Sequence, residues 1–488
     1  MTLRPAKVDG KTLSSFEPKL FNSDVVITGV SINASEVKSG DLFIALPGTK
    51  THGMNFIDQA ISNGAVAVLS DRKIESKIPV FIDPSPRNLV GSISDWAYNK
   101  PFSKLEAVGI TGTNGKTTTS NLVKQLWELN NINSGLIGTL GVEIGEEKIS
   151  GVRTTPEADE LQALAAVMVE RGNTHLAMEV SSIAIDQGRI NSAKYKVVAF
   201  SNLTQDHLDY HKSMDQYFDA KAKLFTPEFA QNAVINIDDQ YGQKLYKMSR
   251  LPNKTVSRSD QSADWHYSKI ESLSDGYNVE ISDKSGQIIS GNFPLIGEHN
   301  LDNLLLAVAC VSICGLTDTQ ITNSISKLKS VPGRLEIISA GQSFSAVVDY
   351  AHTPDAVSRV LKSVRSFTSG RVIGILGCGG DRDKSKRLPM GQALFNGSDL
   401  AIFTSDNPRS EKAEAILKDM TDGINMAEKG FVLTDRKDAI NFAAKTAKPG
   451  DCILLMGKGH ESGQEISGVV TPFDDRIELA NSIKQVIG

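Results

Sequence analysis

Short apolar runs alternate with polar turns over the first hundred residues of the chain. The runs DVVITGV, DLFIAL, AVAVLS and PVFID are separated by turn residues and by one helical pattern, NFIDQAISNGA. Runs of this length, bounded by turn signals, are typical of short strands. We therefore predict a small α/β domain over residues 1–101. It ends in the connector WAYNKPFSKLE, where Pro101 follows a polar turn.

Longer apolar runs mark the middle of the chain. The segments LEAVGI, HLAMEV, VVAFSNL and NAVINID are continuously apolar, as expected for parallel strands that helices cover on both faces. Each run ends in polar residues, and ligands bind beyond the carboxyl ends of strands in such sheets. The sequence therefore predicts a central domain, residues 102–331, in which these strand ends meet in one crevice.

The same pattern returns after a break at SVPGRLEII. The segments FSAVVDYA, RVIGILGCGG, DLAIFTSD and DCILLMGKG again read as buried strands with polar endings. They predict a third, Rossmann-like α/β domain over residues 332–488. The expected fold class is α/β with three domains, the central one a P-loop-type parallel sheet with helices on both faces.

Composition and charge exclude several classes of protein. Of the 488 residues, 40% are apolar and 22% are charged, and the net charge is −5. Binding to duplex nucleic acid needs a concentrated positive face, so we expect no nucleic-acid partner. No run approaches about 18 apolar residues and the start lacks an apolar signal core. We therefore expect a cytoplasmic protein without membrane insertion. As a separate expectation, which these features do not determine, we take the protein to be a monomer.

The stretch GITGTNGKTTTSNLV, residues 109–123, reads as a phosphate-binding loop that opens a helix. Successive backbone N–H groups from Gly112 to Thr117 would form an anion cradle at the helix N-terminus. Lys116 would neutralise a transferred phosphate, and the Thr117 hydroxyl would ligate magnesium. Ile110 stands where the common ATPase spacing has a glycine, which argues against the common GTPase and motor families.

The loop and eight further motifs resemble the Mur ligase superfamily, which includes the folylpolyglutamate synthetases. In chain order they are TGTNGKTT, TTPE, MEVSS, NLTQDHLDYH, YFDAKAKLF, GEHNLDN, PGRLE, VDYAHTPD and GCGGDRDKSKR. The RTTPE and GGDRDKSKR forms are most similar to the UDP-N-acetylmuramoyl-tripeptide synthetases. This resemblance implies an ATP-dependent ligase of peptidoglycan synthesis. It would add meso-diaminopimelate to UDP-N-acetylmuramoyl-L-alanyl-D-glutamate through an acyl phosphate.

The resemblance also implies the metal and ATP contacts. Thr117, Glu179, His207 and Lys221 would hold two magnesium ions, with Lys221 modified to N6-carboxylysine, a carbamate. Without the motifs, His207 would read as a surface histidine, and Lys221 and Lys223 as a solvated helix face. Asp349 could equally be a turn cap. The implied ATP contacts are Gly112, Thr113, Asn114, Gly115, Lys116, Thr117, Thr118, Asn300 on the adenine, Arg334 on the phosphates and Asp349 on the ribose.

Two further residue sets are similar to substrate contacts of the family. The first would bind the UDP-sugar dipeptide: Thr154, Thr155, Ser181, Gln187 and Arg189. The second would bind meso-diaminopimelate: Arg382, Asp406, Asn407, Arg409, Gly457 and Glu461. A guanidinium at Arg409 can hold the distal carboxylate of diaminopimelate, whereas it would repel the bare ammonium of lysine. Taken alone, the DNPR sequence would be a plain turn.

Two positions depart from the family pattern, and three alternatives stay open. Asn33, Ala34 and Ser35 stand where the family usually has Asp-Ser-Arg, so uridine contacts must differ, and Ile183 replaces a histidine. A lysine-adding sister enzyme would lack Arg409 and its neighbours. A folylpolyglutamate synthetase should lack the front domain and DNPR. A non-enzymatic nucleotide switch would need neither the metal ligands nor Arg382.

Overall fold

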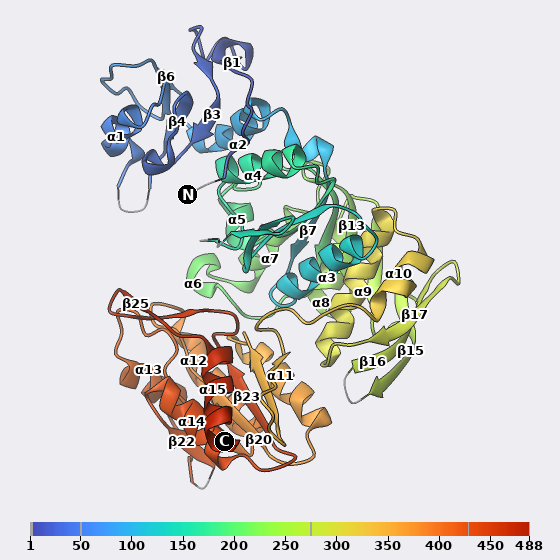
Figure 1. Ribbon diagram of the computed structural model, residues 1–488. Helices are drawn as coiled ribbons and strands as arrows, with labels where there is room; N and C mark the ends of the chain where they lie inside the picture. The colour runs from blue at the N-terminus through green and yellow to red at the C-terminus, as the bar shows by residue number, and fades with distance from the viewer. Residues whose placement is uncertain are drawn as a thin grey trace.

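A computed structural model of the chain describes residues 3–48, 51–149, 151, 153–273, 276–427 and 429–487. Three α/β sheets follow one another from the N-terminus to the C-terminus (Figure 1). This confirms the predicted α/β class and the three-domain organisation, while the boundaries at residues 101 and 331 stay predictions. Within the described ranges, every helix is too short or too polar to cross a membrane.

The N-terminal sheet is small and parallel. Its strands are β3 (Gly29–Ser31), β4 (Asp41–Ala45), β5 (Ala67–Ser70) and β6 (Val80–Ile82). The predicted run DVVITGV divides, because β2 (Val26–Ile27) pairs instead with β1 (Lys11–Thr12). The predicted helix starts as a 3-10 turn, η3 (Gly53–Phe56), and continues as α1 (Ile57–Ser62).

The helix α2 (Pro86–Ala97) joins the N-terminal sheet to the central domain, where it packs on α4 (Ala158–Glu170). The approach is close at Gly91, where a Cβ atom would lie only 2.2 Å from the carbonyl oxygen of Asn191. A larger residue at position 91 would therefore push the two domains apart.

The central sheet has eleven strands and carries most of the predicted crevice. In spatial order they are β10 (Glu147–Ile149), β9 (Gly141–Ile144), β8 (Ser134–Gly138), β11 (His175–Glu179), β7 (Glu106–Thr111), β12 (Tyr195–Phe200), β13 (Ala230–Asn236), β14 (Asn253–Ser257), β15 (Trp265–Leu273), β16 (Gly276–Asp283) and β17 (Ile288–Phe293). The four predicted strands β11, β7, β12 and β13 are parallel neighbours, as expected. The two antiparallel edges, from β8 to β10 and from β15 to β17, were not predicted.

Helices cover both faces of this sheet. On one face Val108 and Ile110 of β7 pack with Trp127 of α3 (Lys116–Glu128) and with α9 (Glu298–Ile313). On the other face Ala107 packs with α4. The remaining helices of this domain are α5 (Ser182–Asp186), α6 (Leu208–His211), α7 (Met214–Ala222), α8 (Gln240–Met248) and α10 (Asp318–Ile325).

The C-terminal sheet is parallel except at one edge. In spatial order its strands are β18 (Glu336–Ile337), β19 (Ser345–Asp349), β23 (Cys452–Met456), β20 (Val372–Leu376), β21 (Leu400–Phe403) and β22 (Gly430–Val432). One face packs on α11 (Pro354–Phe367), α12 (Arg387–Gly397) and α13 (Ala413–Thr421), and the other on α14 (Arg436–Thr446) and α15 (Asp475–Ile487). A hairpin of β24 (Gly463–Ile466) and β25 (Val469–Pro472) extends from this domain (Figure 1).

A buried ion pair connects two helices and two strand ends of this domain. The Arg436 guanidinium meets Asp475 through two bonds of 2.8 and 2.6 Å, and both side chains are fully buried. The same guanidinium donates to the carbonyls of Ser405 and Met456. These two residues lie just beyond β21 and at the end of β23, the strands on either side of β20, so one cation connects two strand ends across the sheet.

We predict that Arg436→Met lowers the free energy of unfolding by about 3–5 kcal/mol, because it leaves the Asp475 carboxylate buried and unpaired. The neighbouring Lys437→Met is the matched control. Lys437 joins the same two helices through an exposed ion pair with Glu478, and such pairs contribute less than about 1 kcal/mol. Equal losses for the two variants in urea unfolding would contradict the prediction.

Candidate active site

The phosphate-binding loop lies between β7 and α3, as predicted. Gly115 has a φ of 87°, a left-handed conformation that favours glycine. A Cβ on Gly112 would lie 1.9 Å from the Ser201 hydroxyl, so this position also requires glycine. The Lys116 ammonium folds back onto the loop and donates to the carbonyls of Gly112 and Thr113, at 2.9 and 2.8 Å. Burial lowers the pKa of Lys116.

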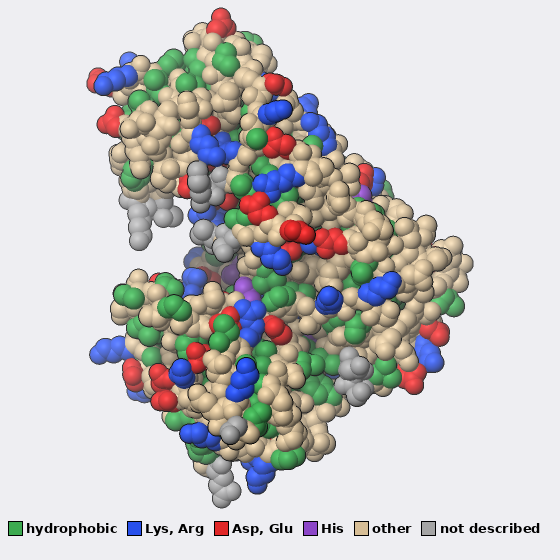
Figure 2. Space-filling view, viewed as in Figure 1, with side chains coloured by type: hydrophobic (Ala, Val, Ile, Leu, Met, Phe, Trp, Pro, Cys, Tyr) green, Lys and Arg blue, Asp and Glu red, His purple; other side chains and the backbone are tan. Residues whose placement is uncertain are grey.

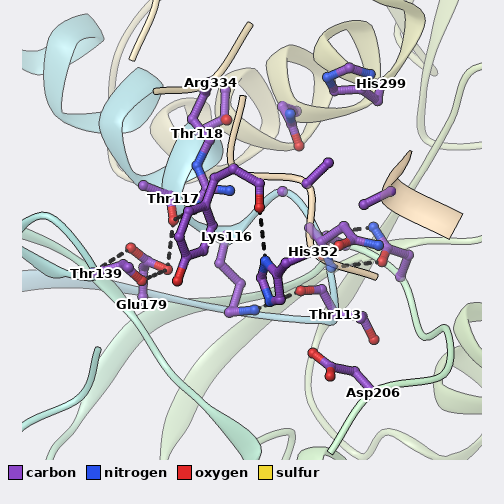
Figure 3. A pocket seen from close by; sticks show the side chains of 18 of the residues that line it. Thr113, Lys116, Thr117, Thr118, Thr139, Glu179, Asp206, His299, Arg334 and His352 are labelled. Carbon is purple, nitrogen blue, oxygen red and sulfur yellow. Dashed lines mark hydrogen bonds between the residues drawn. The ribbon is translucent and has the colours of Figure 1, made fainter. Parts of the chain in front are cut away.

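The Glu179 carboxylate lies at the mouth of this loop (Figure 3). It accepts hydrogen bonds from the Thr117 hydroxyl at 3.0 Å and from the backbone and hydroxyl of Thr139, at 2.8 and 3.1 Å. Arg334 of the C-terminal segment also donates to the Thr117 hydroxyl, at 3.0 Å. A hydroxyl and a carboxylate held side by side are suitable oxygen ligands for a hard cation such as Mg²⁺.

Lys221 is buried, with 1% of its surface exposed. Its ammonium donates to the carbonyl of Gly112 at 2.8 Å, the same oxygen that Lys116 uses, and lies 4.6 Å from the Tyr217 ring centre. Burial, with the nearby Lys116 charge, holds the pKa of Lys221 well below its usual range. Lys223 is exposed and pairs with Asp186 at 2.9 Å. The solvated helix face therefore describes Lys223 and not Lys221.

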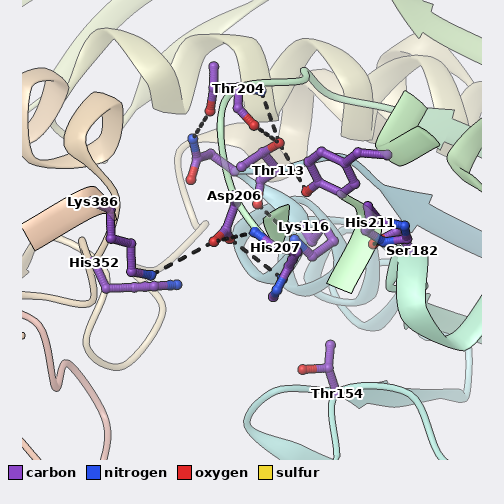
Figure 4. A network of polar contacts seen from close by, with 12 residues as sticks. Thr113, Lys116, Thr154, Ser182, Thr204, Asp206, His207, His211, His352 and Lys386 are labelled. Carbon is purple, nitrogen blue, oxygen red and sulfur yellow. Dashed lines mark hydrogen bonds and ion pairs between the residues drawn. The ribbon is translucent and has the colours of Figure 1, made fainter. Parts of the chain in front are cut away.

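A polar network connects His207 to the C-terminal domain (Figure 4). Asp206 accepts a bond from the His207 backbone at 2.9 Å, and its carboxylate lies 3.5 Å from the His207 ring and 3.8 Å from the Lys386 ammonium. Burial alone would raise the pKa of Asp206, but His207, His352 and Lys386 bring it to about 2. His207 has a left-handed φ of 52°, which is costly for a non-glycine residue and is often found at functional sites.

One cleft collects these groups from the central and C-terminal domains. Figure 2 shows the surface hollowed between the two ends of the molecule. The residues of the predicted sets that line the cleft are Thr113, Asn114, Gly115, Lys116, Thr117, Thr118, Thr154, Glu179, Ser181, His207, Lys221, Arg334 and Asp349. In the described part of the chain, no three His, Cys, Asp or Glu side chains form a metal-binding cluster. The predicted metal set contains only two residues of these types.

Two predicted ATP contacts, Asn300 and Asp349, form hydrogen bonds with other residues of the protein. Asn300 is buried and is not among the residues that line the cleft. Its side-chain amide oxygen accepts a hydrogen bond from the side chain of Asn303, which does line the cleft. Asp349 accepts bonds from the backbone N–H groups of Leu335 and Ala351, both at 2.7 Å. Its carboxylate thus acts as a turn cap that positions the Arg334 loop.

The predicted dipeptide contacts form a group on the side of the cleft toward the N-terminal domain. Thr155 donates to the Glu179 backbone at 3.0 Å and approaches the Ser181 hydroxyl at 3.4 Å. Arg189 binds Gln187, and its Nε lies 3.0 Å from the Glu157 carboxylate. Ile183, beside this group, occupies the second position of the short helix α5.

A second cavity lies between the N-terminal sheet and α4. Asn33, Ala34 and Ser35 line it, together with Arg87 and Arg153. Asn33 caps a 3-10 turn by accepting a bond from the Ser35 backbone at 3.1 Å. The three residues that depart from the family pattern therefore lie on the wall of this cavity.

The predicted amino-acid contacts lie together at the strand ends of the C-terminal sheet. Asn407 donates to Glu461 at 2.8 Å. Arg409 donates to the carbonyl of Gly380 at 2.8 Å and lies 3.3 Å from Glu465. Gly457 has a φ of 111°, and a Cβ there would lie 2.6 Å from the Asp406 carboxylate. Arg382 is exposed on the loop after β20, and both its Cγ and the Arg409 Nη1 lie within 4 Å of where a Gly379 Cβ would be.

Several residues of the site were not predicted from the sequence. They are Thr139, Asn303, His352, Lys386, Lys458 and Glu465. Thr139 directly follows β8, so the rule that ligands bind at strand ends could have found it. Lys386 and His352 fall inside quoted motifs. Their positions beside Asp206 could not be read from the sequence, because they belong to another domain.

Three family models match successive parts of the chain. The models are the Mur ligase family, catalytic domain, at residues 26–99; the Mur ligase middle domain, at 110–311; and the Mur ligase, glutamate ligase domain, at 333–459. A relative from Streptomyces coelicolor is 41% identical over 99% of both chains. The chain belongs to the Mur ligase family. That relative is named UDP-N-acetylmuramoyl-L-alanyl-D-glutamate--2,6-diaminopimelate ligase.

Solved structures of Mur ligases share the fold. A structure with the same ligase name as the Streptomyces relative is 32% identical, covers 98% of this chain and 99% of its own, and has a TM-score of 0.71. Folylpolyglutamate synthase of Mycobacterium tuberculosis, complexed with ADP and AMPPCP, is 18% identical with a TM-score of 0.62. It covers 76% of this chain and 92% of its own, and at this identity the likeness concerns the fold alone.

Three histidines in or beside the cleft have lowered pKa values, and we therefore predict that the stability of the protein depends on pH. Burial lowers the pKa values of His299, His352 and His460 from 6.5 to about 4. As pH falls from about 6.5 to about 4, the unfolded chain takes up protons on these rings and the folded protein does not. The thermal midpoint should therefore fall over this window. His352→Gln should reduce the slope, and His266→Gln, outside the cleft, is the control. An unchanged slope in His352→Gln would exclude this origin.

Proposed function

We propose that this chain is an ATP-dependent ligase that joins meso-diaminopimelate to UDP-N-acetylmuramoyl-L-alanyl-D-glutamate, in peptidoglycan precursor synthesis. One observation carries the proposal: a phosphate-binding site and an amino-acid cluster lie at the strand ends of two different domains. A phosphate-binding loop lies in the central domain, and a cluster containing Arg409, Asn407 and Glu461 lies in the C-terminal domain. The near full-length relative with this ligase name agrees with it.

The cleft suits a two-step ligation. A carboxylate oxygen of the UDP-sugar dipeptide attacks the γ-phosphorus of ATP, and ADP leaves. The amine nitrogen of the amino acid then attacks the acyl carbon, phosphate leaves, an amide bond forms and the amine loses its proton. The first step brings anions together, and Lys116 and Arg334 supply positive charge at the loop where phosphates would lie.

Magnesium would be held by Thr117, Glu179, His207 and a carbamate on Lys221. The metal would neutralise the developing charge on the phosphates. The Thr117 and Glu179 oxygens are 3.0 Å apart, which suits a shared cation. A neutral amine attacks CO₂ to form a carbamate and releases a proton, and the buried Lys221 has the lowered pKa that this chemistry needs. The carbamate would replace a repelled cation by an anion beside Lys116.

The UDP-sugar dipeptide would lie between the two cavities. Thr154, Thr155, Ser181, Gln187 and Arg189 offer hydroxyls, an amide and a guanidinium for its sugar and peptide part. The nucleotide would then extend into the N-terminal cavity, past Asn33 and Ser35. We further expect a monomer that acts in the cytoplasm.

Diaminopimelate is favoured over lysine by the charges of the C-terminal cluster. Its distal end carries both an ammonium and a carboxylate, and the cluster offers Glu461 for the first and Arg409 for the second. Arg382 would hold the carboxylate beside the reacting amine. Lysine-adding activity is the second candidate, because the relatives with the diaminopimelate ligase name are about 40% identical and one contact decides the choice.

The choice of amino acid predicts the behaviour of Arg409→Ala. This variant should lose most kcat/KM with diaminopimelate while the KM for ATP stays nearly unchanged, because a buried charged contact is worth about 2–5 kcal/mol. The assay follows ADP release with the UDP-sugar dipeptide and either diaminopimelate or lysine. Equal use of both amino acids by the wild type would assign the chain to the sister activity, and no amino-acid-dependent turnover would contradict the ligase function.

The carbamate predicts a chemical rescue. Lys221→Ala should be inactive, and short carboxylic acids should partly restore activity by supplying the missing anion. Lys223→Ala, the exposed neighbour on the same helix, should retain wild-type activity. A crystal structure of active enzyme with an unmodified Lys221 ammonium would rule out the modification.

A further inference from the structure

Lys458 is a fully buried lysine inside the amino-acid cluster. It follows β23, between Gly457 and the loop that carries Glu461. Its ammonium donates to the Asn407 side-chain oxygen at 3.1 Å, to Glu461 Oε2 at 3.2 Å and to the carbonyl of Gly463 at 2.7 Å. The three acceptors match the three protons of an ammonium, so the side chain has one conformation that satisfies them all.

The ammonium determines which way the Asn407 amide points. Lysine can only donate, so the amide oxygen of Asn407 must face it. The backbone N–H of Glu465 donates to the same oxygen at 2.9 Å. The amide NH₂ group is thereby directed at Glu461, to which it donates at 2.8 Å. Without Lys458, the backbone N–H of Glu465 would be the one remaining donor of the two that hold the Asn407 oxygen in this orientation.

The ammonium also anchors Glu461 by one oxygen. Lys458 and Asn407 both bind Oε2, and 32% of the Glu461 side chain remains exposed. Among the described residues, no hydrogen-bond donor lies within reach of Oε1. The carboxylate is thus held at one end while its other oxygen is available to an incoming ammonium.

The third contact of Lys458 links the cluster to the hairpin of β24 and β25. Gly463, whose carbonyl accepts from Lys458, is the first residue of β24. Two residues further on, Glu465 lies 3.3 Å from the Arg409 guanidinium, and its backbone carbonyl accepts a bond from the Arg409 N–H at 3.1 Å. One buried cation therefore connects Asn407, Glu461 and, through β24, Arg409, which are three of the predicted amino-acid contacts.

We propose that Lys458 is a positioning residue for the incoming amino acid: it orients Asn407 and Glu461 and, through β24, places Arg409. This inference rests on the proposed function and deepens it. Burying an ammonium is costly unless all its bonds are made, and here each bond holds a part of the binding cluster. The role differs from a purely structural one because its loss should affect one substrate and not the others.

The experiment compares Lys458→Met with Lys458→Arg in steady-state assays of the full chain. Lys458→Met keeps most of the side-chain length but removes the charge and the three donors. The KM for diaminopimelate should then rise roughly tenfold to a hundredfold, as expected for the loss of hydrogen bonds to charged groups. The KM values for ATP and the UDP-sugar dipeptide should change less than about threefold. Lys458→Arg should recover part of the loss, because a guanidinium can also donate to several of these acceptors.

The matched control is Lys429→Met in the same domain. Lys429 also donates to two backbone carbonyls, those of Phe395 and Ser398, but lies outside the cluster. It should lower the thermal midpoint without raising the KM for diaminopimelate. If Lys458→Met does not fold, the KM of Lys458→Arg decides, because the displaced charge should still raise it. Unchanged amino-acid KM values in the folded variants, or equal rises for all three substrates, would overturn the inference. A wild type that uses no amino acid would contradict the proposed function instead.

Discussion

The carbonyl oxygen of Gly112 is the contact on which the active site depends. It accepts hydrogen bonds from Lys116 and from Lys221, which places two ammonium groups from different helices side by side in the cleft. Two buried like charges repel each other, so the pocket favours either a lost proton or a bound anion. Burial together with the nearby Lys116 charge lowers the pKa of Lys221, and the proposed carbamate would follow from this lowered pKa.

The second constraint is the close approach of two loops in the C-terminal domain. A Cβ on Gly333 would lie 2.2 Å from the backbone nitrogen of His460, and Gly333 itself has a φ of 66°. The loop that carries Arg334 therefore packs against the loop that carries Lys458 and Glu461. A displacement of either loop would move the other, so the proposed phosphate and amino-acid sites share one support.

Charge is distributed between the two sites in different ways. In the cleft, Asp206 and Glu179 are each held by several donors, while Lys116 and Arg334 bring positive charge to the phosphate-binding loop. In the amino-acid cluster, cations and carboxylates alternate: Lys458 binds Glu461, and Arg409 lies beside Glu465. The first arrangement attracts phosphates and carboxylates, whereas the second suits a ligand end with both charges. The two substrates of a ligation would thus be separated by electrostatics.

The sequence by itself determined the strands, the loop and the residue types at the strand ends. Continuous apolar runs predict buried parallel strands because both faces of β7 must be covered, and Gly112 and Gly115 mark the loop because no other residue fits their space or φ. It did not predict the antiparallel edges of the central sheet, because strands such as β15 are largely exposed and lack a continuous apolar run. Only the tertiary structure showed that Asn300 lies behind Asn303, that Asp349 caps a turn, and that Lys221 is buried while Lys223 is not. The tertiary structure also placed Lys386 beside Asp206 and Lys458 beside Asn407. Contacts between domains and between loops depend on how the sheets pack, and they leave no local pattern in the sequence.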